Sequence, residues 1–213
     1  MIKNQPKSIK WLFYLHLITY KKENCRIPQE KPTYKQVQNR YDTLRQVARK
    51  IAFEELAPVI PNKRGMAILK STISLDGFTF DCQKALRKWE KTGLRRVAWD
   101  WDEILKKYRT HPKRFELSVW HRDMYLCGAS IGRPTWSGGK LRLDYLESAP
   151  QGTSLDGLIT DITIAASVAY AKTIGAVQLR IMNPVNEDVK NYYLSKPGFF
   201  YNQRKNFCYR DLI

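Results

Sequence analysis

The chain has 213 residues, of which 43% are hydrophobic, and it includes 6 Trp, 12 Tyr and 8 Phe. This composition allows one sizeable folded domain and excludes an intrinsically disordered chain, which lacks the apolar surface that offsets the entropy of ordering. The formal charge is +17, and it is uneven: residues 1–70 carry 15 basic and 5 acidic side chains, residues 71–140 carry 14 and 8, and residues 141–213 carry 8 and 7. We expect an anionic partner such as nucleic acid, an acidic membrane surface or a phosphate-bearing ligand. The alternative is a lysine-rich surface that has no specific anionic partner.

The first 25 residues look like a secretion signal, because three lysines precede the apolar run Trp11–Ile18. The run contains His16 and large aromatic residues, however, and no small-residue cleavage site follows it. We therefore expect a folded segment of the mature protein. No stretch approaches the roughly 20 apolar residues that span a bilayer, so we expect no membrane insertion and a cytoplasmic location.

The four cysteines are widely separated and show none of the paired spacings of a metal site; they are Cys25, Cys82, Cys127 and Cys208. We expect no bound metal. The cysteines are typical of isolated thiols in a reducing compartment, with two disulfides as the alternative in an oxidising one.

Residues 34–57 predict an amphipathic helix that Pro58 ends. Its apolar positions recur every three or four residues, at Val37, Tyr41, Leu44, Ala48 and Ile51. A basic helix of this kind can lie on phosphates or a membrane, but a helix packed on a core with a solvated basic face is commoner. We assign residues 1–62 to a basic extension that includes this helix and packs on a main domain formed by residues 63–213.

The middle of the chain predicts short elements. Asn62–Gly65 is a loop, and Ala67–Leu75 is a strand that ends at the Asp76-Gly77 turn. A short helix runs from Asp81 to Gly93, and a second, capped by Asp100 or Asp102, covers Glu103–Tyr108.

The last hundred residues predict a sheet with helices. Three antiparallel strands are indicated by alternating patterns at Phe115–His121 and Lys140–Glu147 and by a run of residues that suit a sheet at Met124–Ile131. A long buried helix capped by Ser154 or Asp156 follows, then a strand, a helix and a final strand or hairpin; these elements are Gly157–Ile174, Val177–Met182, Asn186–Ser195 and Phe199–Tyr209. A tight loop that leads into a helix between two strands is the local architecture that holds an anionic cofactor.

One motif in this region is informative. After the strand that ends at Met182 come Asn183-Pro184-Val185-Asn186, a short helix with Tyr193, and Gly198-Phe199. Together with the order of elements, these residues resemble the GNAT superfamily of N-acetyltransferases over roughly residues 115–210. A second match is Leu146-x-Ser148-x-Pro150, at the position where the family's fourth strand splays from the fifth. The resemblance implies an α/β fold with a mixed, mostly antiparallel central sheet flanked by helices, to which this chain adds its basic helical extension.

The resemblance also implies catalytic roles. In the family a backbone N–H on the splayed strand polarises the thioester carbonyl, a carboxylate or water takes the amine proton, and the helix tyrosine protonates the leaving thiolate. By position these roles fall to the backbone around Leu146 and Ser148, to Glu147 or Asp144, and to Tyr193 with Tyr192 as its substitute. Strand alternation places the two carboxylates on opposite faces. The alternatives are a solvated strand carboxylate for Glu147 and a core aromatic for Tyr193.

The loop before the long helix departs from the family pattern. Thr153 stands where the family places Arg, and Asp156 stands where it places Gly. Its N–H groups can still form an anion nest for the pyrophosphate of acetyl-CoA. The cofactor-binding residues that we assign are Leu146, Ser148, Gln151, Gly152, Thr153, Ser154, Gly157 and Asn186.

We therefore expect an enzyme that transfers an acyl group from acetyl-CoA to a primary amine. The basic first two thirds of the chain favours an anionic or RNA-linked acceptor, such as an aminoacyl-tRNA or a ribosome-associated protein, and the chain could act as a homodimer. The alternative is a non-catalytic GNAT-like module that binds nucleic acid or protein.

Overall fold

The computed structural model describes residues 31–212. The apolar run Trp11–Ile18 and Cys25 lie outside this range. One compact unit begins at Tyr34, so it includes the amphipathic helix α2 (Tyr34–Glu55), which we placed in an extension. The predicted apolar face of α2 is confirmed, since Ala48 is buried in the main core and Tyr41, Leu44 and Ile51 are partly buried against it.

Nine strands and four further helices follow α2. The strands are β1 (Val59–Pro61), β2 (Ala67–Leu69), β3 (Ile73–Asp76), β4 (Phe115–His121), β5 (Tyr125–Pro134), β6 (Lys140–Ser148), β7 (Gln178–Met182), β8 (Phe199–Asn202) and β9 (Phe207–Asp211), and the helices are α3 (Phe80–Glu90), α4 (Trp101–Tyr108), α5 (Ile159–Thr173) and α6 (Glu187–Leu194). The prediction is confirmed for every element from β4 onward, with small shifts of the ends.

The predicted strand Ala67–Leu75 is wrong, because it is two strands in two sheets. The β2 part pairs with β1 in a small hairpin, whereas β3 pairs with β4 at the edge of the main sheet. A 3-10 turn over Lys70–Thr72 separates them, and it is held by a hydrogen bond from Thr72 Oγ1 to the Leu69 carbonyl at 2.7 Å. The hairpin therefore lies outside the main sheet.

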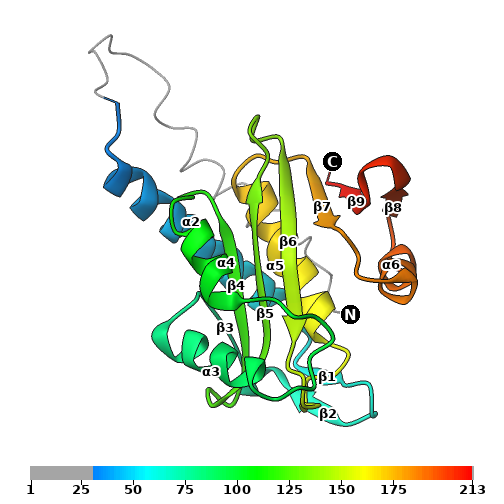
Figure 1. Ribbon diagram of the computed structural model, residues 1–213. Helices are drawn as coiled ribbons and strands as arrows, with labels where there is room; N and C mark the ends of the chain where they lie inside the picture. The colour runs from blue at the N-terminus through cyan, green and yellow to red at the C-terminus, as the bar shows by residue number, and fades with distance from the viewer. Residues whose placement is uncertain (1–30, 213) are drawn as a thin grey trace, which may run out of the picture. The chain divides into compact units, whose positions relative to one another are not determined.

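The main sheet has seven strands in the order β3-β4-β5-β6-β7-β9-β8. All neighbours are antiparallel except β6 and β7, which are parallel and joined through α5. Helices α3 and α4 lie on one face over the β4–β5 part of the sheet, and α5 lies on the other face with α2 (Figure 1). The mixed, mostly antiparallel sheet flanked by helices that the sequence predicts is confirmed.

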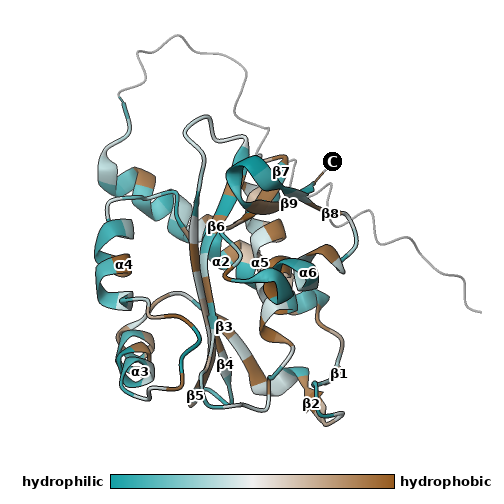
Figure 2. Cartoon of the chain, turned by 45° about the vertical axis from the view of Figure 1, so that its right-hand side comes forward, coloured by the Kyte–Doolittle hydropathy of each residue, from teal (hydrophilic) through white to brown (hydrophobic). Residues whose placement is uncertain are grey.

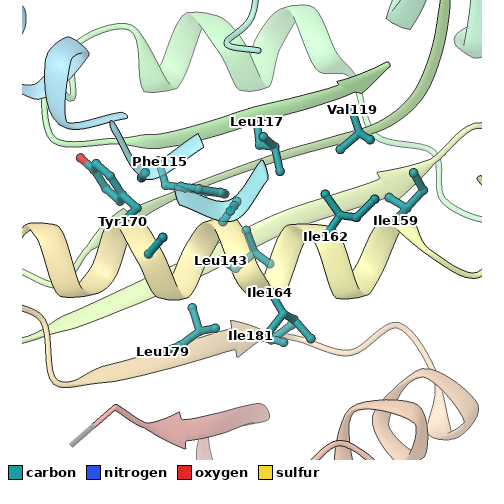
Figure 3. Close-up of a cluster of buried hydrophobic side chains, with 14 of the residues drawn as sticks. Phe115, Leu117, Val119, Leu143, Ile159, Ile162, Ile164, Tyr170, Leu179 and Ile181 are labelled. Carbon is teal, nitrogen blue, oxygen red and sulfur yellow. The ribbon is translucent and has the colours of Figure 1, made fainter. Parts of the chain in front are cut away.

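Helix α5 is apolar around most of its circumference because it is covered on two sides. It packs on the inner face of the sheet and also against α2. Figure 3 shows its Ile159, Ile162 and Ile164 among side chains of β4, β6 and β7. A second core lies beneath α3 and α4, whose outer sides are largely hydrophilic (Figure 2). Trp101 of α4 is buried in this second core.

A bulge in β6 shapes the centre of the sheet. The register of β5 and β6 shifts between Ile131 and Gly132, which leaves Asp144 as the extra residue. A Cβ atom on Gly132 would lie 2.0 Å from the Arg142 carbonyl oxygen, so this close approach of the two strands requires glycine.

Strands β6 and β7 part at the bulge. Their pairing runs from Lys140–Gln178 to Leu143–Ile181 and ends there, although β6 continues to Ser148. The remaining edge of β6 is thus splayed away from β7, as the sequence match around Leu146 and Ser148 predicts. We call the opening between these two strands the splay.

Candidate active site

The splayed edge of β6 presents backbone N–H groups. The N–H of Ala149 donates to the Cys127 carbonyl of β5 at 2.9 Å. Because successive N–H groups of a strand point to opposite edges, those of Leu146 and Ser148 point away from β5, toward the splay. Both predicted residues therefore stand at the edge where a ligand carbonyl could accept a hydrogen bond.

The loop between β6 and α5 closes on itself through Asp156. Its carboxylate accepts a hydrogen bond from the Thr153 N–H at 2.8 Å, and Gly157 adopts a left-handed conformation with φ of 84°. The Ser154 hydroxyl is bonded to His121 Nδ1 at 2.9 Å. The prediction that Ser154 or Asp156 caps the helix is therefore wrong.

Helix α5 begins later than predicted, at Ile159, and its N-cap residue Leu158 supplies no side-chain hydrogen bond. The first turn of a helix leaves N–H groups without intrahelical partners, and the helix dipole attracts negative charge there. An uncapped start of this kind fits a phosphate group.

The β1–β2 hairpin packs against this loop, which the sequence did not predict. The buried Asn62 donates to the Ser154 carbonyl at 2.9 Å, and the Lys63 N–H donates to the Asp156 carbonyl at 3.0 Å. Arg64 forms an ion pair with Asp156 at 3.1 Å. The hairpin thus brings two cations to a loop that has Thr153 in place of the family's arginine. The available signal was the turn Asn62–Gly65 between two short apolar runs.

A third cation reaches the start of α5 from the other side. Lys196, which follows α6, forms an ion pair with Asp161 in the first turn of α5 at 2.7 Å. Burial acts to lower the pKa of Lys196, but the contacts with Asp161 and Tyr192 leave this pKa above its ordinary value. The ammonium group is therefore charged at neutral pH.

A groove of about 790 Å³ opens beside the loop and is also bordered by α3. Gln151, Gly152, Thr153 and Ser154 line one side of it, and Lys88, His121 and Arg122 are among the other lining residues. Burial and the neighbouring Arg122 lower the pKa of His121, so its imidazole is neutral at neutral pH. The positive charge of the groove therefore comes from its lysine and arginine side chains.

Glu147 is held by three donors. Arg95 contacts its two carboxylate oxygens at 2.7 and 2.8 Å, and Trp101 Nε1 donates to one of them at 2.7 Å. The side chains of Glu147 and Arg95 are only 7% and 9% exposed. The oxygens that would take a proton from an amine are thus already engaged, which favours a structural role for Glu147.

Asp144, the alternative base, is similarly enclosed. Its carboxylate accepts from Tyr108 Oη at 2.5 Å and pairs with Arg142 at 2.6 Å. Since Tyr108 and the Trp101 that binds Glu147 both belong to α4, the two carboxylates lie on the same face. The prediction of opposite faces is wrong because the bulge at Asp144 shifts the alternation by one residue.

Tyr193 is buried on α6 and only 4% exposed. Its ring packs near Phe199 with 6.4 Å between the centroids. Burial, then the nearby Cys208 and Tyr192, raise the pKa of its phenol, so the hydroxyl keeps its proton at neutral pH. Asn186, which we assigned to cofactor binding, caps α6 by accepting the Val189 N–H at 2.9 Å.

The other predictions concern thiols, metals and membranes. Cys82, Cys127 and Cys208 are free and buried, and burial raises the pKa of Cys82 to about 12 and that of Cys127 to about 11. Among residues 31–212, no group of three or more His, Cys, Asp or Glu side chains is placed to hold a metal ion. Within the same range, none of the helices combines the length and the hydropathy needed to cross a bilayer.

The sequence matches no protein-family model and no curated protein, but the fold is similar to known acetyltransferase structures. Ard1 from Thermoplasma volcanium shows a TM-score of 0.50 at 13% identity, over 67% of this chain and 99% of that one. A spermidine N-acetyltransferase variant from Vibrio cholerae shows 0.50 at 12% identity, over 67% and 95%. A GNAT-family acetyltransferase from Staphylococcus aureus Mu50 shows 0.51 at 11% identity, over 66% and 99%.

Proposed function

We propose, from its GNAT fold and from the splayed strands, that this chain transfers an acetyl group from acetyl-CoA to a primary amine. The observation that carries the proposal is the end of the β6–β7 pairing at Leu143 and Ile181, with the uncapped start of α5 beside it. An extended acyl thioester with an anionic tail fits a gap between strands that leads to a helix N-terminus.

The residues around the start of α5 suit the phosphates of CoA. The N–H groups of the first helical turn would receive the pyrophosphate, with Lys63, Arg64 and Lys196 nearby. The loop would contribute only N–H groups other than those of Thr153, Leu155 and Asp156, which already donate within the loop. Arg64 offsets the charge of Asp156, which would otherwise repel an anion. Cations from outside the loop would thus replace the arginine missing at Thr153.

Acetyl-CoA supplies an activated acetyl thioester when it is bound. The N–H groups of Leu146 and Ser148 would donate to a carbonyl oxygen in the splay and stabilise negative charge there. Tyr193 would deliver its phenolic proton to the departing thiolate, since its raised pKa keeps it protonated. Glu147 would position the segment between α3 and α4 through Arg95 rather than take the amine proton.

For the acceptor we propose an amine carried on an anionic or RNA-linked molecule. The groove beside the loop carries Lys88 and Arg122, and both belong to the basic first two thirds of the chain. Such cations would bind the carrier and leave the amine free to reach the splay.

Acetyl-CoA should stabilise the protein against heat. At about 100 times its dissociation constant a ligand adds about 2.7 kcal/mol, which raises the Tm of a chain of this size by roughly 5–11 °C. Thermal unfolding with acetyl-CoA, and with ATP as a control polyphosphate, measures this effect. A Tm that saturating acetyl-CoA leaves unchanged would favour the non-catalytic module, for which the altered residues Thr153 and Asp156 are the supporting observation.

The charges at the loop should tune cofactor affinity in opposite directions. Arg64→Gln should weaken acetyl-CoA binding by up to about fivefold, because an exposed ion pair contributes at most about 1 kcal/mol. Asp156→Asn keeps an acceptor for the Thr153 N–H but removes the negative charge, so it should tighten binding by a similar factor. Calorimetric titration of both variants and of the double variant checks this, and the double variant should bind acetyl-CoA with nearly the wild-type affinity. Equal affinities in the wild type, the two single variants and the double variant would place the phosphates elsewhere.

A further inference from the structure

A row of five side chains crosses five neighbouring strands. The register aligns Arg133 of β5 with Arg142 of β6, Arg142 with Arg180 of β7, Arg180 with Tyr209 of β9, and Tyr209 with Phe200 of β8. Neighbouring strands lie about 4.8 Å apart, so the row runs for roughly 19 Å across the sheet.

These side chains point to the face that carries α3 and α4. Their neighbours along the strands, Leu143, Leu179 and Cys208, belong to the core on the opposite face with α5, and alternation turns the row outward. Helices α3 and α4 lie over the other part of the sheet (Figure 1). Phe200 is 56% exposed and the Arg142 side chain 34% exposed, so the row can be reached by a ligand.

The arginine half of the row carries more positive charge than its surroundings neutralise. Arg142 pairs with Asp144, but Arg180 contacts the neutral Gln178 at 2.6 Å, and Arg133 contacts His111 at 2.8 Å. Burial and then Arg133 lower the pKa of His111, which makes it neutral at neutral pH.

Like charges on adjacent strands destabilise a sheet. Burial and then the neighbouring Arg142 lower the pKa of Arg180. Asp211, which faces Gln178 across β7 and β9, is bonded to the Gln178 amide at 2.8 Å. An anion placed over these arginines would relieve the repulsion.

The other half of the row is aromatic. The Phe200 and Tyr209 rings lie 5.7 Å apart at 36°. The Arg180 guanidinium lies 4.5 Å from the ring centre of Phe207, which itself contacts Tyr209. Because Phe207 is buried and Arg180 is aligned with Tyr209, the cations lie directly beside the rings.

We propose that this row binds single-stranded nucleic acid, with phosphates over Arg133, Arg142 and Arg180 and a base stacked on Phe200 or Tyr209. Sheet surfaces that combine a basic track with exposed rings bind single strands in this way, because every base offers a ring face. A duplex hides its base faces and would use the arginines alone. As a statement about the acceptor, this inference rests on the proposed acetyl transfer, whereas the binding itself does not require acetyl-CoA.

The experiment measures binding by fluorescence anisotropy, without acetyl-CoA. The probes are labelled oligouridylate, labelled oligothymidylate and a labelled duplex of equal length. One variant is Arg133→Gln with Arg180→Gln, which spares the Arg142–Asp144 pair, and another is Phe200→Ala at an exposed site. The matched control is Lys35→Gln with Lys50→Gln, which removes the same charge from exposed positions of α2.

The arginine variant should weaken single-strand binding by about tenfold and reduce the salt slope by about 1.4, since each phosphate contact on a single strand contributes about 0.7. Phe200→Ala should weaken single-strand binding by at least about fivefold and leave duplex binding unchanged. The ratio of the two single strands then tells RNA from DNA. The proposal is overturned if the lysine control weakens binding as much as the arginine variant, or if Phe200→Ala has no effect. Because unfolding with acetyl-CoA is measured separately, either idea can fail alone.

Discussion

Replacing Tyr193 with phenylalanine should lower kcat for acetyl transfer by about 10²- to 10⁴-fold, the usual contribution of a positioned acid. The ring stays in place in the variant, because Tyr193 packs in the core beside Phe199. Only the hydroxyl is removed, and with it the proton that burial holds on the phenol. A thiolate leaving group without a proton donor raises the barrier for the transfer.

The matched control is Tyr192→Phe, on the adjacent and more exposed position of α6. Tyr192 is 38% exposed, and the ammonium of Lys196 lies 4.6 Å from its ring centre. Loss of the Tyr192 hydroxyl should leave kcat close to that of the wild type. Release of the CoA thiol, with spermidine and with charged total tRNA as acceptors, measures both variants, and unfolding curves check that each is folded. Full activity of Tyr193→Phe would remove this residue from the proton transfer, and a selective loss in Tyr192→Phe would assign the role to its neighbour.

Most of the fold could be predicted because its signals are local. Phe115–His121 and Lys140–Glu147 alternate with period two, and turn residues such as Gly138 and Gly175, both at positive φ, separate the elements. The hairpin of β1 and β2 was missed because each of its strands has only three residues, too few for a period. The bulge at Asp144 was missed because an added residue in a strand leaves the pattern of residue types unchanged while it turns the following side chains over.

The candidate site was predictable in part for a related reason. The match around Leu146 and Ser148 predicts the position of the splay, and the motif from Asn183 to Phe199 predicts the short helix that carries Tyr193, since each depends on sequence neighbours. Arg64 meets Asp156 across 92 positions, and Arg95 meets Glu147 across 52. Contacts between such distant residues depend on the packing of the whole sheet, so residue types along the chain cannot indicate them. The electrostatics of the site is therefore set by partners outside the motif.

The pair of Arg95 and Glu147 should be the most sensitive of these contacts to substitution. Arg95→Ala would leave a buried carboxylate with Trp101 as its remaining donor, and removal of one partner of a buried pair costs about 3–5 kcal/mol. The Tm should fall by roughly 6–20 °C for a chain of this length. Arg95 also donates to the Trp99 carbonyl at 2.7 Å, so the segment between α3 and α4 should loosen as well.

A double substitution separates the loss of the pair from the burial of a lone charge. Arg95→Leu with Glu147→Leu removes both charges and keeps apolar volume, so it should cost far less than Arg95→Ala, because a buried pair can be replaced by packed hydrophobic residues at little or no cost. A loss of stability equal to that of Arg95→Ala would mean that the hydrogen bond from Arg95 to the Trp99 carbonyl, rather than the ion pair, holds the segment between α3 and α4.

Glu147→Gln tests whether the carboxylate of this pair also acts as the general base. The amide keeps an acceptor for Trp101 but carries no charge, so stability should fall while kcat, measured well below the Tm, stays within a few fold of the wild type. A general base that is lost lowers the rate by about 10²- to 10⁴-fold. A fall of that size in a folded Glu147→Gln protein would show that Arg95 releases the carboxylate during turnover, and Glu147 would then be the base that its position on the splayed strand predicts.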